Sequence, residues 1–170
     1  LAINEDANHL RSLGDVFITE PKNASKLMKR TKDTTVNSKG KFHKKKCFGR
    51  SIKNRCPSGF QTTVERKFKT SGGIYIEVPN NYRASQYDHT ADDYIKKKLS
   101  DRIYKLTDGT LVQRDWYSSF LLYCYDYRTQ DIDKDKCITD FGRCYDKEKA
   151  LIAWIKANHI KILNSGIKVA

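Results

Sequence analysis

The 170-residue sequence contains no long hydrophobic run, and this absence excludes one large class of proteins. A membrane-spanning helix needs about 18–20 consecutive, mostly apolar residues, and no stretch approaches that length. The first residues, "LAINEDANHLRSLGD", form no apolar signal segment but have the spacing of an amphipathic helix. We therefore expect no membrane partner. Because the sequence begins inside such a helix, at Leu1 rather than Met, we expect a piece of a longer protein.

Paired cysteines are also missing. The sequence has an odd number of cysteines and no Cys-x-x-Cys motif; they are Cys47, Cys56, Cys124, Cys137 and Cys144. This pattern favours reduced thiols and a cytoplasmic location over a disulfide framework. A zinc site recruited from His43, Cys47 and Cys56 stays open, although their spacing fits no standard zinc motif.

Negative charge is scarce relative to positive charge. The sequence has 33 Lys and Arg against 20 Asp and Glu, a net charge of +13. Hydrophobic residues make up 38%, below the usual value of about 45–50% for globular proteins, so the expected core is modest. Because a chain this basic usually binds a polyanion and the membrane is disfavoured, nucleic acid is the expected partner.

The positive charge is concentrated in residues 22–56, which we predict to be a basic arm or loop insertion. Thirteen Lys or Arg and one acid, Asp33, lie between residues 22 and 55. Phe42 and Phe48 are interleaved with them and permit stacking on bases. A solvated tail is the alternative to a phosphate-contacting arm. The expected nucleic-acid contacts here and further along the chain are Lys41, Lys44, Lys45, Lys46, Arg50, Lys53, Arg55, Lys96, Lys97, Lys98 and Arg114.

The first half of the sequence predicts a strand–helix–strand unit. We expect a helix over residues 1–13, a strand over 16–20, a helix over about 58–71 and a strand over 74–79. Phe60, Val64 and Phe68 have the spacing of a core stripe, and we expect alternate residues of the second strand, from Ile74 to Val78, to share one face. This order favours parallel pairing in an α/β sheet covered by helices. Glu20 then stands at the carboxyl end of a strand, where such sheets bind ligands.

The second half predicts a hairpin followed by helices. Asp108-Gly109 indicates a turn between two strand-forming runs within residues 102–113. A helix follows, with Trp116, Phe120, Tyr123 and Tyr127 along one stripe, and a last helix is expected over about 147–163. Asp115 stands at the start of the first of these helices. It is either a helix-start acid favoured by the helix dipole or a catalytic carboxylate. Other acids are expected to be solvated loop residues: Asp88, Asp92, Asp93, Asp101 and Asp108.

Two stretches together resemble a known family. "GRSIKNRCPSGFQTTVERKFKTSGGIYIEVPNNYRASQ" and "KKKLSDRIYKLTDGTLVQRDWYSSFL", with "VFITE" before them, resemble the C-terminal part of the OrfB/TnpB transposon-encoded proteins. These are RNA-guided DNA nucleases related to the type V CRISPR effectors. The shared features occur in the family's order, from the strand ending in Glu to the Gln-Arg-Asp that opens a helix. The resemblance covers residues 10–122 approximately.

The resemblance implies an RNase H-like (RuvC-like) α/β fold, with a mixed sheet flanked by helices. Such nucleases hold Mg²⁺ with three acids in a two-metal site, and the second and third match Glu20 and Asp115. The first acid is absent from this sequence, so the metal site is incomplete here. The family often carries a zinc ribbon before the last acid, but this stretch has no cysteines. We therefore expect no structural zinc and a degenerate zinc-ribbon-like hairpin over residues 84–112.

These expectations give a domain plan and a function. Residues 1–128 are expected to form a partial RuvC-like nuclease domain, and residues 129–170 a helical C-terminal extension. The implied function is the nuclease portion of a transposon-associated RNA-guided DNA endonuclease of the prokaryotic cytosol and nucleoid. Its partners would be DNA, guide RNA, and the N-terminal remainder of the protein, which a separate chain could also supply. Without that remainder we expect no cleavage. The alternatives are a non-catalytic module of the same descent and a generic basic nucleic-acid-binding protein.

Overall fold

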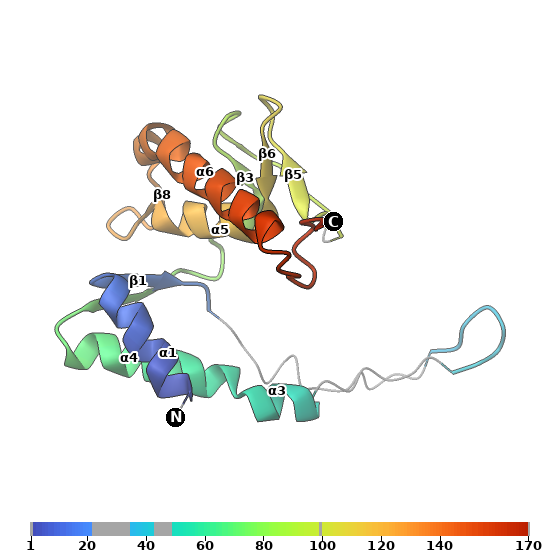
Figure 1. Ribbon diagram of the computed structural model, residues 1–170, viewed down its shortest axis with the longest axis horizontal. Coiled ribbons are helices and arrows are strands. Elements are labelled where there is room, and N and C mark those ends of the chain that lie inside the picture. The colour runs from blue at the N-terminus through green and yellow to red at the C-terminus, as the bar shows by residue number, and fades with distance from the viewer. Residues whose placement is uncertain (1, 22–34, 43–48, 99, 170) are drawn as a thin grey trace. The chain divides into compact units, whose positions relative to one another are not determined.

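The computed structural model describes residues 2–21, 35–42, 49–98 and 100–169 (Figure 1). These residues form a mixed arrangement of α-helices and small two-stranded sheets. The chain divides into two compact units, Leu1–Glu77 and Val78–Ala170, and each is described by itself.

The first unit contains the predicted strand–helix–strand arrangement. Helix α1 (Ala2–Leu13) leads into strand β1 (Val16–Thr19), and helix α4 (Pro57–Thr70) leads into strand β2 (Ile74–Glu77). Pro57 lies in the first turn of α4, where its missing N–H is not needed. Strands β1 and β2 pair in parallel, which confirms the expected pairing.

The core of this unit lies between the two helices and the sheet. Helices α1 and α4 pack together (Figure 1), and Ala7, Val64 and Phe68 are buried between them. The predicted stripe on α4 is therefore confirmed. Within β2, Tyr75 packs on this core together with Phe17. Ile74, on the opposite face of β2, is 55% exposed.

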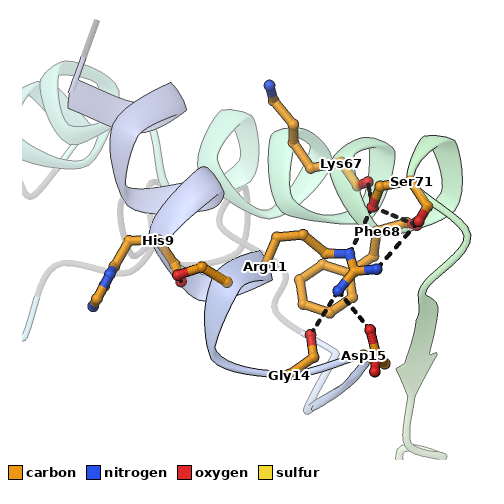
Figure 2. Close-up of polar contacts among 8 residues, drawn as sticks. His9, Arg11, Gly14, Asp15, Lys67, Phe68 and Ser71 are labelled. Atoms are coloured by element: carbon orange, nitrogen blue, oxygen red, sulfur yellow. Dashed lines mark hydrogen bonds and ion pairs between the residues drawn. The ribbon is translucent and has the colours of Figure 1, made fainter.

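Arg11 joins the ends of the two helices, as Figure 2 shows. Its Nε donates to Ser71 Oγ at 2.6 Å, and one terminal nitrogen donates to the Ser71 carbonyl oxygen at 3.1 Å. The other terminal nitrogen donates to the Gly14 carbonyl oxygen at 3.1 Å and forms an ion pair with Asp15 at 2.8 Å. Since both helices end at this guanidinium, its positive charge is favourably placed at two negative helix termini.

The predicted basic arm is described only in part. Residues 22–34 and 43–48, with Lys44, Lys45 and Lys46, lie outside the described residues. Val36 and Phe42 form an isolated antiparallel bridge around a tight turn, in which Asn37 Oδ1 accepts from the backbone of Lys39 and Lys41. Gly49–Arg55 forms helix α3, so this part of the predicted basic arm or loop insertion is helical.

The second unit is built from short hairpins and two longer helices. The 3₁₀-helix η1 (Ala84–Gln86) precedes strands β3 (Tyr87–Asp88) and β4 (Asp93–Tyr94). Strands β5 (Ile103–Lys105) and β6 (Leu111–Gln113) form the predicted hairpin, with Gly109 in its turn at φ 93°. Helix α5 (Arg114–Tyr123) follows, then strands β7 (Tyr125–Asp126) and β8 (Asp131–Ile132), and helix α6 (Lys134–Ala157).

Two sequence predictions in this unit were wrong. Helix α5 ends at Tyr123, and its buried residues are Tyr117, Phe120 and Leu121, whereas Tyr123 and Tyr127 are exposed. A short β-hairpin, unrecognised in the sequence, takes the chain away from the helical path there. Helix α6 starts at Lys134 rather than near 147, because the Asp133 side chain accepts from the Lys136 N–H and caps it.

Among the described helices, none is both long and apolar enough to cross a membrane.

Asp88 is a buried crosslink between two hairpins, not the solvated acid that was predicted. It is 1% exposed. Its Oδ1 accepts from the Thr90 N–H at 3.0 Å and hydroxyl at 2.7 Å. Its Oδ2 accepts from the Thr107 N–H and hydroxyl, both at 2.9 Å. The carboxylate thus connects the β3–β4 turn to the β5–β6 turn across the stretch in which the resembling family often carries zinc.

Candidate functional site

Asp115 lies in the first turn of helix α5, directly after strand β6. Its side chain is 64% exposed, while that of the neighbouring Arg114 is only 16% exposed. Arg114 Nε lies 3.0 Å from Asp115 Oδ1. The carboxylate is therefore available to solvent and is partly engaged by a cation. An acid here is also favourable at the positive end of the helix dipole.

Gln113 fixes the backbone on which Asp115 stands. Its side-chain oxygen accepts from the Trp116 N–H at 2.7 Å and so caps α5. Its side-chain nitrogen donates to Asp115 Oδ2 at 3.4 Å and to the Ser165 carbonyl oxygen at 3.3 Å. The side chain thus joins the start of the helix, the candidate carboxylate and the C-terminal segment.

Glu148 supports Gln113 from helix α6, and the sequence analysis missed it. It is 3% exposed, and its Oε1 accepts from the Gln113 N–H at 2.7 Å. Its Oε2 has no hydrogen-bond partner among the described residues, and burial raises the pKa of this carboxyl. A sequence signal existed, since Glu148 lies seven residues before the buried Ile155 and so on the same face of α6.

Glu20 belongs to the other unit. It follows β1 directly and is half-buried. Its place at the carboxyl end of a parallel strand pair agrees with the predicted position. Glu20 lies in the first unit and Asp115 in the second. Because each unit is described by itself, the structure gives no distance between the two carboxylates.

The donor chemistry of these acids suits the metal that the resemblance implies. Carboxylate oxygens are the ligands that Mg²⁺ prefers, and Asp115 exposes one group of this kind. Within the described residues, however, no three His, Cys, Asp or Glu side chains form a metal-binding group. Glu20 and Asp115 therefore stay predicted metal ligands.

The predicted nucleic-acid contacts lie in both units. Lys41, Lys53 and Arg55 are exposed in the first unit, and Lys96 and Lys98 are exposed in the second. Arg50 lies in α3, and its side chain is outside the described residues. The exposed ammonium and guanidinium groups can reach phosphates without losing packing.

Lys97 has a different environment from its two neighbours. Its Nζ lies 4.7 Å from the Tyr104 ring centroid and 5.2 Å from that of Tyr117. The atom is buried, with no hydrogen-bond partner among the described residues, and burial lowers its pKa. A phosphate contact by Lys97 would require the side chain to leave these rings.

A comparison of the sequence with protein-family models found no matching family, and a comparison with curated proteins found no match either.

Proposed function

We propose that this chain is the C-terminal nuclease portion of an RNA-guided DNA endonuclease, with an RNase H-like fold. The exposed carboxylate of Asp115 carries the proposal. It stands on a helix start that the buried side chains of Gln113 and Glu148 hold in place. The ordered sequence motifs, the parallel β1–β2 pair followed by Glu20 and the net charge of +13 support it.

In this proposal the two acids have the same role. Glu20 and Asp115 supply carboxylate oxygens to a divalent cation, together with a third acid from outside this sequence. The bound cation would supply Lewis-acid activation of water and would stabilise charge on the scissile phosphate. The basic side chains bind the backbone, and pairing with the guide RNA supplies sequence specificity.

The experiment is Mg²⁺-dependent DNA cleavage by the whole protein that carries this chain, with its copurified RNA. We expect Asp115→Asn and Glu20→Gln each to lower cleavage at least about 100-fold, because each removes charge from a metal ligand while leaving a similar shape. Binding of the DNA should change little. Asp101→Asn, an exposed acid outside the proposed site, is the matched control.

Cleavage that survives both substitutions would show that these acids are not catalytic. RNA-guided binding by the unaltered protein without any cleavage would support the alternative, a non-catalytic module of the same descent. The hydrogen bonds of the buried Asp88 do not distinguish the nuclease from the non-catalytic module, because they stabilise the fold in either case.

A further inference from the structure

A hollow of about 390 Å³ lies on the surface of the second unit. The segment before η1, strand β4 and the β7–β8 hairpin form its walls, which are largely polar. The side chains that matter here are Asn81, Arg83, Tyr94, Gln130 and Asp131. Ligand pockets commonly measure about 300–1,000 Å³, so this hollow has the size for a small ligand or for one group of a larger one.

An arginine stacked on a tyrosine lies in the wall of this hollow. The Arg83 guanidinium carbon is 4.7 Å from the Tyr94 ring centroid. Tyr94 is itself held by the ring of Tyr87, with centroids 5.2 Å apart. The guanidinium of the exposed Arg83 thus lies over a ring that Tyr87 supports, and this contact favours one position of the guanidinium before any ligand binds.

The remaining polar groups decide which ligand suits the hollow. Asp131 lines the hollow together with Tyr94, and burial and this carboxylate raise the pKa of the Tyr94 hydroxyl. The carboxylate balances the charge of the Arg83 guanidinium, so the two side chains together have no net positive charge to attract a phosphate. It accepts hydrogen bonds from amino and imino groups, and the amides of Asn81 and Gln130 can both donate and accept.

We propose that this hollow binds one unpaired nucleotide base, stacked on the Arg83 guanidinium and read at its edge by Asn81, Gln130 and Asp131. Arginine planes and side-chain amides bind splayed bases of single-stranded nucleic acids in this way. The phosphates of that strand stay outside the hollow, and Lys96 and Lys98, which follow the lining residue Tyr94 in the sequence, are exposed. The proposal deepens the nucleic-acid binding of the proposed function and does not depend on cleavage.

The test compares two probes with the full chain at fixed salt: a short oligodeoxyadenylate and an abasic oligonucleotide of the same length. Both carry the same phosphates, and only the first carries bases. We expect the unaltered chain to bind the adenylate roughly tenfold more tightly, which is the scale of one stacked base. Arg83→Lys keeps the charge but removes the plane, so it should bring the two affinities together.

Two further variants make the comparison specific. Arg143→Lys makes the same change at an exposed arginine paired with Asp140 on α6, and it should retain the base preference. Gln130 has φ 58°, a conformation that favours glycine, so Gln130→Gly removes the amide without straining the turn. This variant should reduce the preference several-fold while leaving the unfolding midpoint unchanged.

Equal binding of both probes by the unaltered chain would overturn the proposal, as would a preference that survives Arg83→Lys. An equal loss of the base preference in Arg83→Lys and Arg143→Lys would also overturn the proposal, since the effect would then not be specific to the hollow. Asp115→Asn should leave the base preference intact. If the chain shows the base preference but the whole protein that carries it never cleaves DNA, the proposed nuclease function is contradicted and the base site is retained.

Discussion

At the scale of single residues, buried polar groups decide how the second unit holds together. Asp88 receives four hydrogen bonds through two oxygens, from Thr90 and Thr107. The β3–β4 and β5–β6 hairpins are short, and isolated two-stranded hairpins are marginally stable in water. A carboxylate that joins both turns therefore adds to the packing that their buried residues Tyr87, Tyr104 and Val112 provide.

Replacement of Asp88 should be strongly destabilising. We expect Asp88→Ala to lower the free energy of unfolding by about 3 kcal/mol or more, because it removes four hydrogen bonds that Thr90 and Thr107 donate to a charged group. Urea denaturation of the chain measures this change. The exposed Asp101 is the control, and Asp101→Ala should cost less than about 0.5 kcal/mol. Equal effects of the two substitutions would contradict the crosslink.

The same residue predicts a pH dependence. Burial by itself raises the pKa of Asp88, but the hydrogen bonds from Thr90 and Thr107 outweigh it and hold the pKa below its ordinary value. Because the folded-state pKa is depressed, its contribution is complete above the unfolded value of about 3.9 and is lost as the pH falls through the folded value. The stability difference between the unaltered chain and Asp88→Asn should therefore be constant near neutral pH and shrink in acid. A difference independent of pH would show that charge is unimportant at this residue.

At the scale of elements, the start of α5 depends on a contact from α6. Glu148 accepts the Gln113 N–H, and Gln113 in turn caps α5 and reaches Asp115. A helix that carries a candidate functional acid in its first turn is thus positioned by a side chain from another helix. In this arrangement Asp115 is exposed, while Gln113 and Glu148 are buried.

Glu148→Ala should lower the free energy of unfolding by about 1–3 kcal/mol, because the buried Gln113 N–H loses its acceptor. Glu148→Gln keeps an acceptor oxygen and should lose less. Asp146→Ala is the control on the same helix, since it breaks only an exposed pair with Lys149 and should cost at most about 1 kcal/mol. Thermal or urea unfolding distinguishes them, and a Glu148→Ala chain as stable as the control would rule out this support.

At the scale of the whole molecule, the net charge of +13 is the dominant property. Binding to single-stranded DNA should weaken steeply as salt rises, because each neutralised phosphate releases counterions. With five or more phosphate contacts, we expect log K against log salt to have a slope of about −3.5 or steeper. Replacement of Lys96 and Lys98 by Ala should make the slope shallower, whereas Arg83→Lys should weaken binding at an unchanged slope. A flat salt dependence would contradict polyanion binding.

Local patterns in the sequence determined much of the fold. Apolar spacing predicted α1, α4 and the core residues Val64 and Phe68, and the Asp-Gly pair predicted the β5–β6 turn. The order strand, helix, strand predicted the parallel pairing of β1 and β2. The helices and the turn follow from residues close together in the sequence, and the pairing of β1 with β2 follows from the order of the elements, so pattern and order suffice to predict them.

Only the tertiary structure decided which polar residues are buried. Asp88 meets Thr107, which is 19 residues away, and Glu148 meets Gln113, which is 35 residues away. No local period encodes such contacts, so Asp88 was predicted to be solvated, the contact of Glu148 was missed, and Lys97 resembled its exposed neighbours. The sequence thus placed Asp115 at the start of a helix. The long-range hydrogen bonds of Gln113 and Glu148 explain why that start is held in place, because a buried donor or acceptor without a partner is costly.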